Sequence, residues 1–306
     1  MRVKRDLSST ADGPVALTIG NFDGVHRGHQ AMLARLVEAA DDLRLPPAVL
    51  TFDPHPREFF APASAPPRLS TLRSKLALFE AYGVATTLVA RFDARLASLD
   101  PDAFVRDILE RRLATRWLLV GEDFRFGRGR SGDLALLRSR ARTFSVEAMR
   151  MVEIDGRRVS STAVREALAA GDLSLAASLL GRNYAITGRV AHGDKRGRTL
   201  GFPTVNLPLR RLPPLTGIFA VLVHGLHGGA RHGVASVGVR PTITDGGRPI
   251  AEAYLFDFGD TVYGRRITIE FLHKLREEMR FPDVDTLTRQ MRHDADDARR
   301  FFAAHA

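Results

Sequence analysis

One short stretch near the start of the chain constrains the fold more than any other feature. Residues 15–19 (Val-Ala-Leu-Thr-Ile) are a compact apolar run of strand-forming residues, typical of a buried parallel strand. A turn carrying Gly20, Gly24 and Gly28 follows, and apolar residues then recur at helical spacing over residues 31–40. This order predicts an anion-binding site, because the first N–H groups of a helix are free and its dipole favours negative charge.

Two histidines lie in this turn. His26 and His29 are three residues apart, so they share one face of the first helical turn and both can donate to the same phosphate oxygens. A pair of polar surface residues is one alternative. A zinc site is another, but it needs a third or fourth ligand and the chain has no cysteine.

The whole turn, Gly-Asn-Phe-Asp-Gly-Val-His-Arg-Gly-His, resembles a known signature. It is similar to the nucleotidyltransferase superfamily with a His-x-Gly-His motif, and in its full form to the bacterial FMN adenylyltransferase (FAD synthetase) branch. The resemblance implies a Rossmann-like domain in which His26 and His29 are catalytic. It also implies a set of nucleotide-binding residues: Gly20, Phe22, Asp23, Gly24 and Gly28.

Composition limits the class of protein. A chain of 306 residues is long enough for two domains, and 44% hydrophobic residues is ordinary for a globular protein. No apolar run approaches the roughly 18 residues of a membrane span. The charged start lacks the apolar segment of a signal peptide, and there is no cysteine for disulfides. We therefore expect a cytoplasmic protein.

The net charge of +10 has three possible explanations. It is compatible with nucleic acid, with anionic small-molecule substrates, or with coding bias, since only four of the 45 basic residues are lysine. The arginines are scattered and few aromatic residues lie between them. We therefore expect small-molecule partners and no nucleic acid, and the oligomeric state stays open.

The first half alternates short apolar strands with helical patterns. Strands are predicted over residues 48–52, 84–90 and 117–121, and helices over residues 71–82 and 101–113. This alternation is typical of a parallel α/β sheet, in which ligands bind beyond the carboxyl ends of the strands. Gly20, Asp53 and Gly121 follow three of these strands, so we expect their loops to converge on one site.

The loop over residues 121–132 mixes aromatic, arginine and glycine residues. By itself it could equally be a mobile basic surface loop. It resembles the Val-Gly-x-Asp-Phe-Arg-Phe-Gly segment of the same family, which helps to hold the flavin nucleotide. The resemblance implies flavin binding by Asp123, with Phe124, Arg125 and Asp53.

A second phosphate site is predicted where residues 160–165 (Ser-Ser-Thr-Ala-Val-Arg) open a helix. Plain helix capping is an equal alternative, because Ser and Thr are good N-caps. The segment resembles the Ser-Ser-Thr-x-x-Arg motif of the family, which binds the triphosphate of ATP. Ser161, Thr162 and Arg165 would take that role.

The pattern changes after residue 182. Short strands with Gly- and Pro-rich turns are predicted over residues 184–190, 217–223, 232–237, 251–256 and 267–271. They indicate a small barrel or a sandwich, of which we expect the antiparallel barrel, and a terminal helix over residues 284–302 has one apolar face to pack on it. We therefore expect two domains, residues 1–182, which contain the adenylyltransferase motifs, and residues 183–306.

A second motif set lies in the second expected domain. Residues 197–206 (Gly-Arg-Thr-Leu-Gly-Phe-Pro-Thr-Val-Asn) resemble the riboflavin kinase family, which implies that residues 183–306 are a kinase domain. The resemblance implies that Thr204 and Asn206, both hard oxygen ligands, hold Mg²⁺ with ATP. It also implies a glycine-rich loop that wraps the nucleotide, with Gly188, His192, Gly193, Gly197, Arg198 and Gly201.

Glu270 lies inside an apolar strand run, where a carboxylate is costly to bury unless it has partners. A strand-edge glutamate facing solvent is the plain alternative. The resemblance makes Glu270 the general base that takes the proton of the ribityl hydroxyl. Three residues depart from those usual in the family, Ser236, Tyr254 and Gly259.

The sequence thus predicts a bifunctional enzyme. One half would phosphorylate riboflavin to FMN with ATP, and the other would adenylylate FMN to FAD and release pyrophosphate. An enzyme with only one live activity is an alternative. Others are an idle flavin carrier and a flavin-responsive, nucleic-acid-binding regulator.

Overall fold

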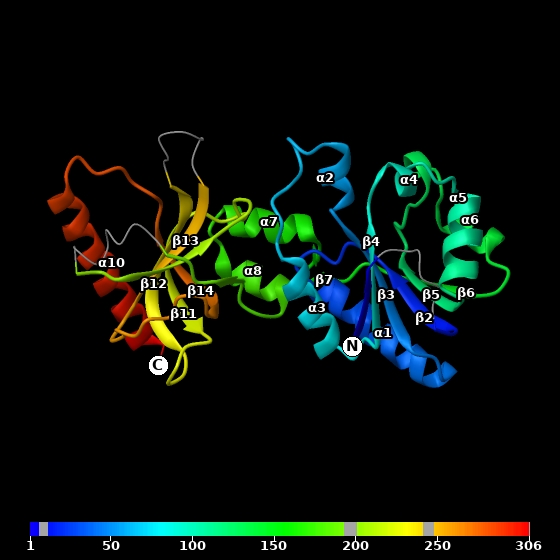
Figure 1. The fold of residues 1–306 in the computed structure, drawn as a ribbon, viewed down its shortest axis with the longest axis horizontal. Coiled ribbons are helices and arrows are strands. Elements are labelled where there is room, and N and C mark those ends of the chain that lie inside the picture. Colours follow the sequence, from blue (N-terminus) through cyan, green and yellow to red (C-terminus); the bar gives the residue numbers. More distant parts are fainter. Residues whose placement is uncertain (6–11, 193–200, 241–247, 306) are drawn as a thin grey trace. The chain divides into compact units, whose positions relative to one another are not determined.

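The computed structural model describes residues 1–5, 12–192, 201–240 and 248–305, and it divides into two compact units (Figure 1). The first unit comprises Met1–Pro66 and Ser70–Ser160, and the second comprises Pro67–Leu69 and Ser161–Ala306. The division after residue 182 stays a prediction from composition. Throughout the described part of the chain, no helix combines the length and apolarity that crossing a membrane requires.

The first unit is built on six parallel strands in the order β1-β4-β3-β2-β5-β6. Their bounds are β1 Arg2–Arg5, β2 Val15–Ile19, β3 Pro47–Asp53, β4 Thr86–Arg91, β5 Thr115–Gly121 and β6 Ser145–Met149. The predicted α/β parallel sheet is confirmed, with all four predicted strands in it. The sequence analysis missed both edge strands, β1 and β6.

Helices cover both faces of this sheet (Figure 1). Helices α1 and α3 pack on the face that carries Ala16 and Val49. The π-helix η1 and helix α6 pack on the opposite face, beside Leu17 and Leu50. The helix bounds are α1 Arg27–Leu43, α3 Leu72–Ala81, α5 Pro101–Ala103, η1 Phe104–Arg112 and α6 Leu134–Arg140. Successive residues of a strand point to opposite faces of the sheet, so they belong alternately to two separate hydrophobic cores.

The order in which strands are added to the sheet reverses at β2. The chain runs from β2 outward through β3 to β4, and then returns to place β5 on the other side of β2. The connections on the two sides lie on opposite faces, with α1 and α3 on one and η1 and α6 on the other. Ligands of open α/β sheets bind at such a switch point, outside the carboxyl ends of the strands.

The second unit is an antiparallel six-stranded barrel in the order β10-β13-β12-β11-β14-β9. Its strands are β9 Ala185–Arg189, β10 Thr204–Pro208, β11 Gly217–His224, β12 Arg231–Arg240, β13 Arg248–Leu255 and β14 Arg266–Arg276. The bridge between Ala191 and Asn206 joins the chain after β9 to β10 and nearly closes the barrel. The predicted barrel is confirmed, although β10 was not predicted as a strand.

Helix α10, Val284–Ala304, packs on the outer face of this barrel. Its buried Ala295 and Ala298 contact Ala220 of β11 and the ring of Phe256. The predicted terminal helix is thus confirmed. Two further helices, α7 Ser161–Ala169 and α8 Leu173–Leu180, belong to the same compact unit.

Short elements fill the loops of the first unit. They are α2 Pro56–Phe60, α4 Ala94–Ala97, η2 Arg128–Arg130 and the hairpin of β7 Glu153–Ile154 and β8 Arg157–Arg158. Each follows a turn or a capping residue; His55, for example, caps α2 by accepting from the N–H of Arg57.

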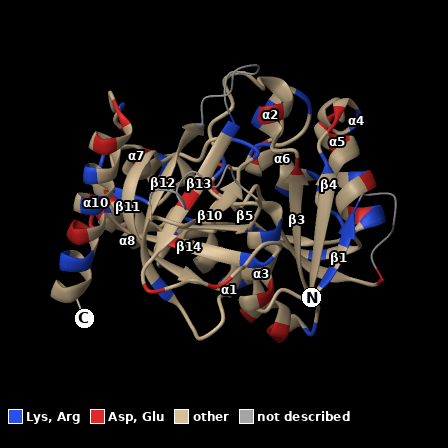
Figure 2. Ribbon diagram, turned by 60° about the vertical axis from the view of Figure 1, so that its left-hand side comes forward, with Lys and Arg blue, Asp and Glu red and all other residues tan. Residues whose placement is uncertain are grey.

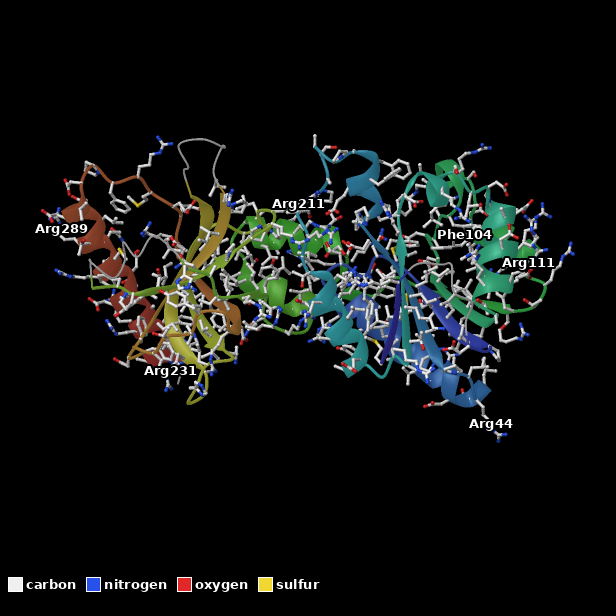
Figure 3. The ribbon with its side chains drawn as sticks, in the orientation of Figure 1. Arg44, Phe104, Arg111, Arg211, Arg231 and Arg289 are labelled. Carbon is white, nitrogen blue, oxygen red and sulfur yellow. The ribbon has the colours of Figure 1, made fainter. Side chains whose placement is uncertain are left out.

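Basic residues are distributed over separate elements. Figure 2 shows Lys and Arg segments on helices and strands alike, and on α10 they alternate with acidic segments. Arg44 after α1, Arg111 on η1 and Arg289 on α10 are exposed, and each points away from the ribbon (Figure 3). The net positive charge is therefore shared among many elements.

Candidate active sites

The turn between β2 and α1 has an unusual backbone. Phe22 and Val25 have φ angles of 50° and 43°, a region that non-glycine residues seldom adopt, and Gly24 has a φ of 82°. The ring of Phe22 folds back over Gly20, where a Cβ atom would lie 3.0 Å from it. Strained residues of this kind persist only where their surroundings hold them, and they cluster at functional sites.

Side chains from outside the turn hold it in place. Asp23 is buried, and its Oδ1 accepts hydrogen bonds from the N–H and the hydroxyl of Ser70, both at 3.1 Å. The N–H of Gly24 donates to the Ser70 hydroxyl at 3.0 Å. The Gln30 amide donates to the carbonyl of Val25 at 2.9 Å. Within the described structure Asp23 therefore acts as an anchor of the turn.

The two histidines are stacked on each other. Their ring centroids are 3.6 Å apart with an interplanar angle of 18°. His26 is the N-cap of α1, and its Nδ1 accepts from the N–H of His29 at 3.3 Å. A neutral imidazole that accepts through Nδ1 carries its proton on Nε2. At Gly28 a Cβ would lie 3.3 Å from the His26 ring, so a residue without a side chain fits there.

His29 is held in its neutral form. Burial lowers its pKa well below the usual 6.5, and the nearby His26 and Lys75 lower this pKa further. Its Nδ1 is buried and, among the described residues, lacks a hydrogen-bond partner. A bound anion would reverse the charge effect and raise the pKa again. The described residues include no group of three or more His, Asp or Glu placed for a metal ion.

The carboxyl ends of three neighbouring strands bring the predicted loops together. Gly20, Asp53 and Gly121 follow or end β2, β3 and β5, which are adjacent in the sheet. Parallel strands present their carboxyl ends at one edge, so the expected convergence of these loops is confirmed at the level of the backbone.

The predicted flavin residues of the loop after β5 differ in exposure. The carboxylate of Asp123 is exposed and forms an ion pair with Arg158 at 2.6 Å. Phe124 is half-buried against the core. Arg125 is exposed and lies 3.4 Å from Asp133. Their role in binding flavin stays a prediction.

Four phenylalanines at the same edge of the sheet were missed by the sequence analysis. Phe59 and Phe60 of α2 pack edge-on against Phe92, with ring centroids 5.6 Å apart in both pairs. Phe52 of β3 also contacts Phe92 edge-on, with ring centroids 5.8 Å apart. Phe60 stays 65% exposed, which is unusual for so large an apolar ring. The signal in the sequence was the tandem Phe-Phe after Pro54-His-Pro.

The predicted triphosphate residues lie at the start of α7, in the second unit. Ser161 is its first residue, followed by Thr162. The Nε of Arg165 donates to the carbonyl of Pro67 at 2.7 Å. The guanidinium of Arg165 thus connects α7 to the short segment 67–69 of the same unit.

Strand β10 carries the predicted magnesium ligands. Asn206 is buried, and its Nδ2 donates to the carbonyl of Thr204 at 3.4 Å. Its Oδ1 is also buried and has no hydrogen-bond partner in the part of the chain that the structure describes. An amide oxygen left in this way is costly, and a bound cation would satisfy it. The donor set therefore fits a hard divalent ion.

The predicted glycine-rich loop is described only at its two ends. The backbone at Gly188 lies close to Leu207, where a Cβ would be 3.3 Å from its side chain. His192 stacks on Tyr263 at 3.8 Å, and Gly201 has a φ of 82°. The other predicted residues, Gly193, Gly197 and Arg198, lie outside the described residues.

Glu270 on β14 makes two strong side-chain contacts. Its Oε1 accepts from the Asn183 amide at 2.7 Å, and its Oε2 lies 2.6 Å from Nε2 of His224. On the neighbouring strand β9, Glu270 pairs with Ala185. Ala185 lies six residues before Ala191, which forms a bridge with Asn206. Six residues of extended chain span about 20 Å. The predicted base therefore lies far along the strand from the predicted metal ligand.

A second carboxylate, missed by the sequence analysis, lies opposite that ligand. Glu252 on β13 pairs directly with Asn206 on β10 and with Ser236 on β12. Directly paired residues point to the same side of a sheet, with Cβ atoms about 5 Å apart. The alternation of apolar and polar residues in Ala-Glu-Ala-Tyr could have placed Glu252 on one face of a strand. Only the pairing register of β10 and β13 shows that it lies beside Asn206.

Family comparisons match both halves of the chain. Residues 8–163 match the family described as FAD synthetase, and residues 180–302 match the family described as riboflavin kinase. The chain belongs to the bifunctional riboflavin kinase/FMN adenylyltransferase family. Membership confirms the resemblance on which the sequence analysis relied.

Curated relatives in this family match nearly the whole chain, and all three named here carry the name bifunctional riboflavin kinase/FMN adenylyltransferase. The Haemophilus influenzae protein is 46% identical over 94% of each chain. The Escherichia coli K12 protein is 45% identical over 99% of this chain and 98% of its own. The Pseudomonas fluorescens protein is 48% identical over 94% of this chain and 93% of its own.

A solved structure shares the fold. It is titled a macrolide-efflux protein from Streptococcus pneumoniae and is 27% identical to this chain, with a TM-score of 0.82. The similarity covers 98% of this chain and 99% of that one. Both units of the fold therefore occur together in another protein.

Proposed function

We propose that this chain phosphorylates riboflavin to FMN and then adenylylates FMN to FAD, using ATP in both steps. The observation that carries the proposal is the likeness to enzymes of that name at 45–48% identity, along the length of both chains. We assign one step to each of the two candidate sites described above.

For adenylyl transfer, a phosphate oxygen of FMN attacks the α-phosphorus of ATP. The bond from that phosphorus to the bridging oxygen breaks, and pyrophosphate leaves. A phosphate is already a nucleophile, so the protein has to position two anions and neutralise charge. We assign this task to His26 and His29 and to the N–H groups in the first turn of α1. Ser161, Thr162 and Arg165 at the start of α7 stay the predicted ligands of the ATP triphosphate.

For the flavin of this step, the exposed ring of Phe60 and its neighbours Phe59 and Phe92 offer an aromatic surface beside Asp53. Flat aromatic ligands stack on such rings. We propose that this cluster receives the isoalloxazine ring, together with the loop that carries Asp123.

For phosphoryl transfer, the ribityl hydroxyl oxygen of riboflavin attacks the γ-phosphorus of ATP, ADP leaves, and a carboxylate takes the hydroxyl proton. Positioning is decisive in such reactions, and reacting groups have to lie about 3 Å apart. Strand register supports Glu252 as this carboxylate because it faces the same side as Asn206. Glu270 stays the alternative that the sequence suggested.

Thr204 and Asn206 would hold Mg²⁺ with the ATP phosphates. When bound, this ion would neutralise charge on the transferred phosphoryl group. The buried, unpartnered Oδ1 of Asn206 supports this role among the described residues.

The first experiment is a time course of the purified protein with riboflavin, ATP and Mg²⁺, with the flavins separated by chromatography. We expect FMN first and FAD after it. FMN alone would leave only the kinase activity, and FMN plus ATP would then be tried directly. The absence of any product would contradict the proposal and favour a binding or regulatory role.

Paired variants decide between the two carboxylates. Glu252→Gln is expected to lower FMN formation by about 100-fold or more while FAD formation from supplied FMN continues. Glu270→Gln is the paired variant, with the same change on a distant part of the barrel. Loss of FMN formation in Glu270→Gln alone would return the role of base to Glu270.

Two further expectations remain open to direct tests. The expected absence of a nucleic-acid partner predicts that the protein gives no salt-dependent gel shift, since phosphate-backbone binding weakens steeply with salt.

The cytoplasmic location expected from the sequence would be tested by fractionating cells that produce the chain.

A further inference from the structure

Lys75 is a buried lysine whose role the proposed reaction leaves unexplained. It lies on α3, and only 7% of it is exposed. Lysine is almost never buried to this extent without partners, because removing an ammonium group from water is costly. The Nζ of Lys75 donates to the carbonyl of Asn21 at 2.6 Å and lies 3.5 Å from the hydroxyl of Thr51.

The atoms that Lys75 contacts belong to the turn before α1. The Thr51 hydroxyl, on β3, also donates to the Asn21 carbonyl at 3.3 Å. Asn21 immediately precedes Phe22, the first of the residues with a positive φ. Lys75 therefore fixes from α3 the point at which the strained turn begins, while Ser70 fixes Asp23 further along.

The charge of Lys75 also acts on His29. Two titratable groups of the described structure act on this ring: His26 on its own helix and Lys75 on α3. Lys75 and His26 both lower the pKa of His29, in addition to burial. A positive charge at this place also favours the approach of an anion.

We propose that Lys75 is a positioning residue for adenylyl transfer, which holds the Asn21 carbonyl and places a positive charge near His29. The proposal rests on the adenylyl transfer proposed above. Lys75 acts through Asn21 and His29 and is assigned no contact with substrate.

The test uses the full-length protein and three variants. Lys75→Met removes the charge and the donor, Lys75→Gln removes the charge and keeps a donor, and Lys75→Arg keeps both. Lys274→Met is the matched control, because Lys274 is a poorly exposed lysine that pairs with Glu277 in the second unit. His29 is followed by NMR titration in the substrate-free protein, with its signal assigned from the spectrum of His29→Gln.

We expect the His29 titration midpoint to rise in Lys75→Met and Lys75→Gln and to stay near the wild-type value in Lys75→Arg and Lys274→Met. FAD formation from FMN should fall about 10- to 100-fold in Lys75→Met. FMN formation by the same chain should stay within twofold. Lys75→Gln keeps the test valid if Lys75→Met fails to fold.

An unchanged His29 midpoint in both neutral variants would overturn the proposal. So would a fall in thermal stability with FAD formation intact, because that result is what a purely structural lysine gives. The titration needs no substrate, so it separates failure of this inference from failure of the proposed adenylyl transfer, which would show as absence of FAD in the wild-type protein.

Discussion

At the scale of single residues, His29 combines burial, an unpartnered Nδ1 and a pKa well below 6.5. We expect His29→Gln to lower FAD formation from FMN by about 100- to 1000-fold, because one donor to the developing charge is lost. FMN formation by the same protein should be unaffected. Chromatography of both products checks this prediction, and normal FAD synthesis by the variant would remove His29 from the mechanism.

The same residue predicts a pH dependence of stability. Because the pKa of His29 is lower in the folded chain than in the unfolded one, the unfolded chain binds more protons as the pH falls below about 6.5. The free energy of unfolding should therefore decrease from pH 6.5 down to the lowered pKa, and then level off. Urea unfolding at pH 8, 6 and 5 should show a smaller decrease for His29→Gln than for the wild type. Equal decreases would contradict the prediction.

Much of the first site could be predicted from residues close together in the sequence. The helix start, the His pair and the glycines follow from spacing within residues 15–29, and the structure arranges them at one turn. Glu252 could not be found in this way, because it is 46 residues from Asn206 in the sequence. The two residues meet only through the pairing of β10 with β13. The aromatic cluster was missed for the same reason, since Phe92 reaches Phe59 and Phe60 across two loops.

At the scale of secondary-structure elements, the barrel depends on a close approach of two strands at Gly233. A Cβ there would lie 2.2 Å from the carbonyl oxygen of Tyr254 on the neighbouring strand β13. We expect Gly233→Ala to separate β12 from β13 and to lower the free energy of unfolding by about 3 kcal/mol. Gly259→Ala, where a Cβ meets nothing within 4 Å, is the control. Chemical denaturation measures both, and equal stabilities would contradict the prediction.

A buried ion pair connects helix α10 to β14. Arg276 and Asp294 share two hydrogen bonds of 2.7 and 2.6 Å, and their side chains are 18% and 5% exposed. Asp294→Asn leaves the guanidinium without its counter-charge, so we expect a loss of about 3–5 kcal/mol in the free energy of unfolding. The exposed pair of Asp296 and Arg299 provides the control, and Asp296→Asn should cost under about 1 kcal/mol. Similar losses in the two variants would refute the special role of the buried pair.

The elements that the sequence analysis missed share a physical cause. The edge strands β1 and β6 lack a continuous apolar run, because fewer of their residues face a core. Strand β10 follows Gly-Phe-Pro and ends at Pro208, and prolines are typical of edge strands and loops alike. Central strands such as β2 were predicted correctly, because all five of its residues are buried.

At the scale of the whole molecule, the two compact units divide the chain between Ser160 and Ser161, whereas composition places a boundary after residue 182. The two boundaries differ in whether α7 and α8 belong to the first or to the second part of the chain. Within the second unit, Lys274 of β14 lies over Gly171 between these helices, so close that a Cβ on Gly171 would be 2.5 Å from its side chain.

This difference leads to a prediction about fragments. We expect a fragment of residues 161–306 to unfold at a higher temperature than one of residues 183–306, because only the longer one keeps α8, which packs on β14, and α7, which packs on α8. Calorimetry of the two fragments measures the difference. Equal melting temperatures would support the boundary after residue 182.

The central position of β2 has a consequence for synthesis on the ribosome. The hydroxyl of Thr18 donates to the carbonyl of Leu119 at 2.9 Å, across 101 residues of sequence. While the chain is being made, β2 can pair with β3 early, but its second neighbour, β5, emerges only after more than a third of the protein has been translated. The histidine turn is among the first segments to be synthesised, but it is enclosed on both sides only after β5 has been made.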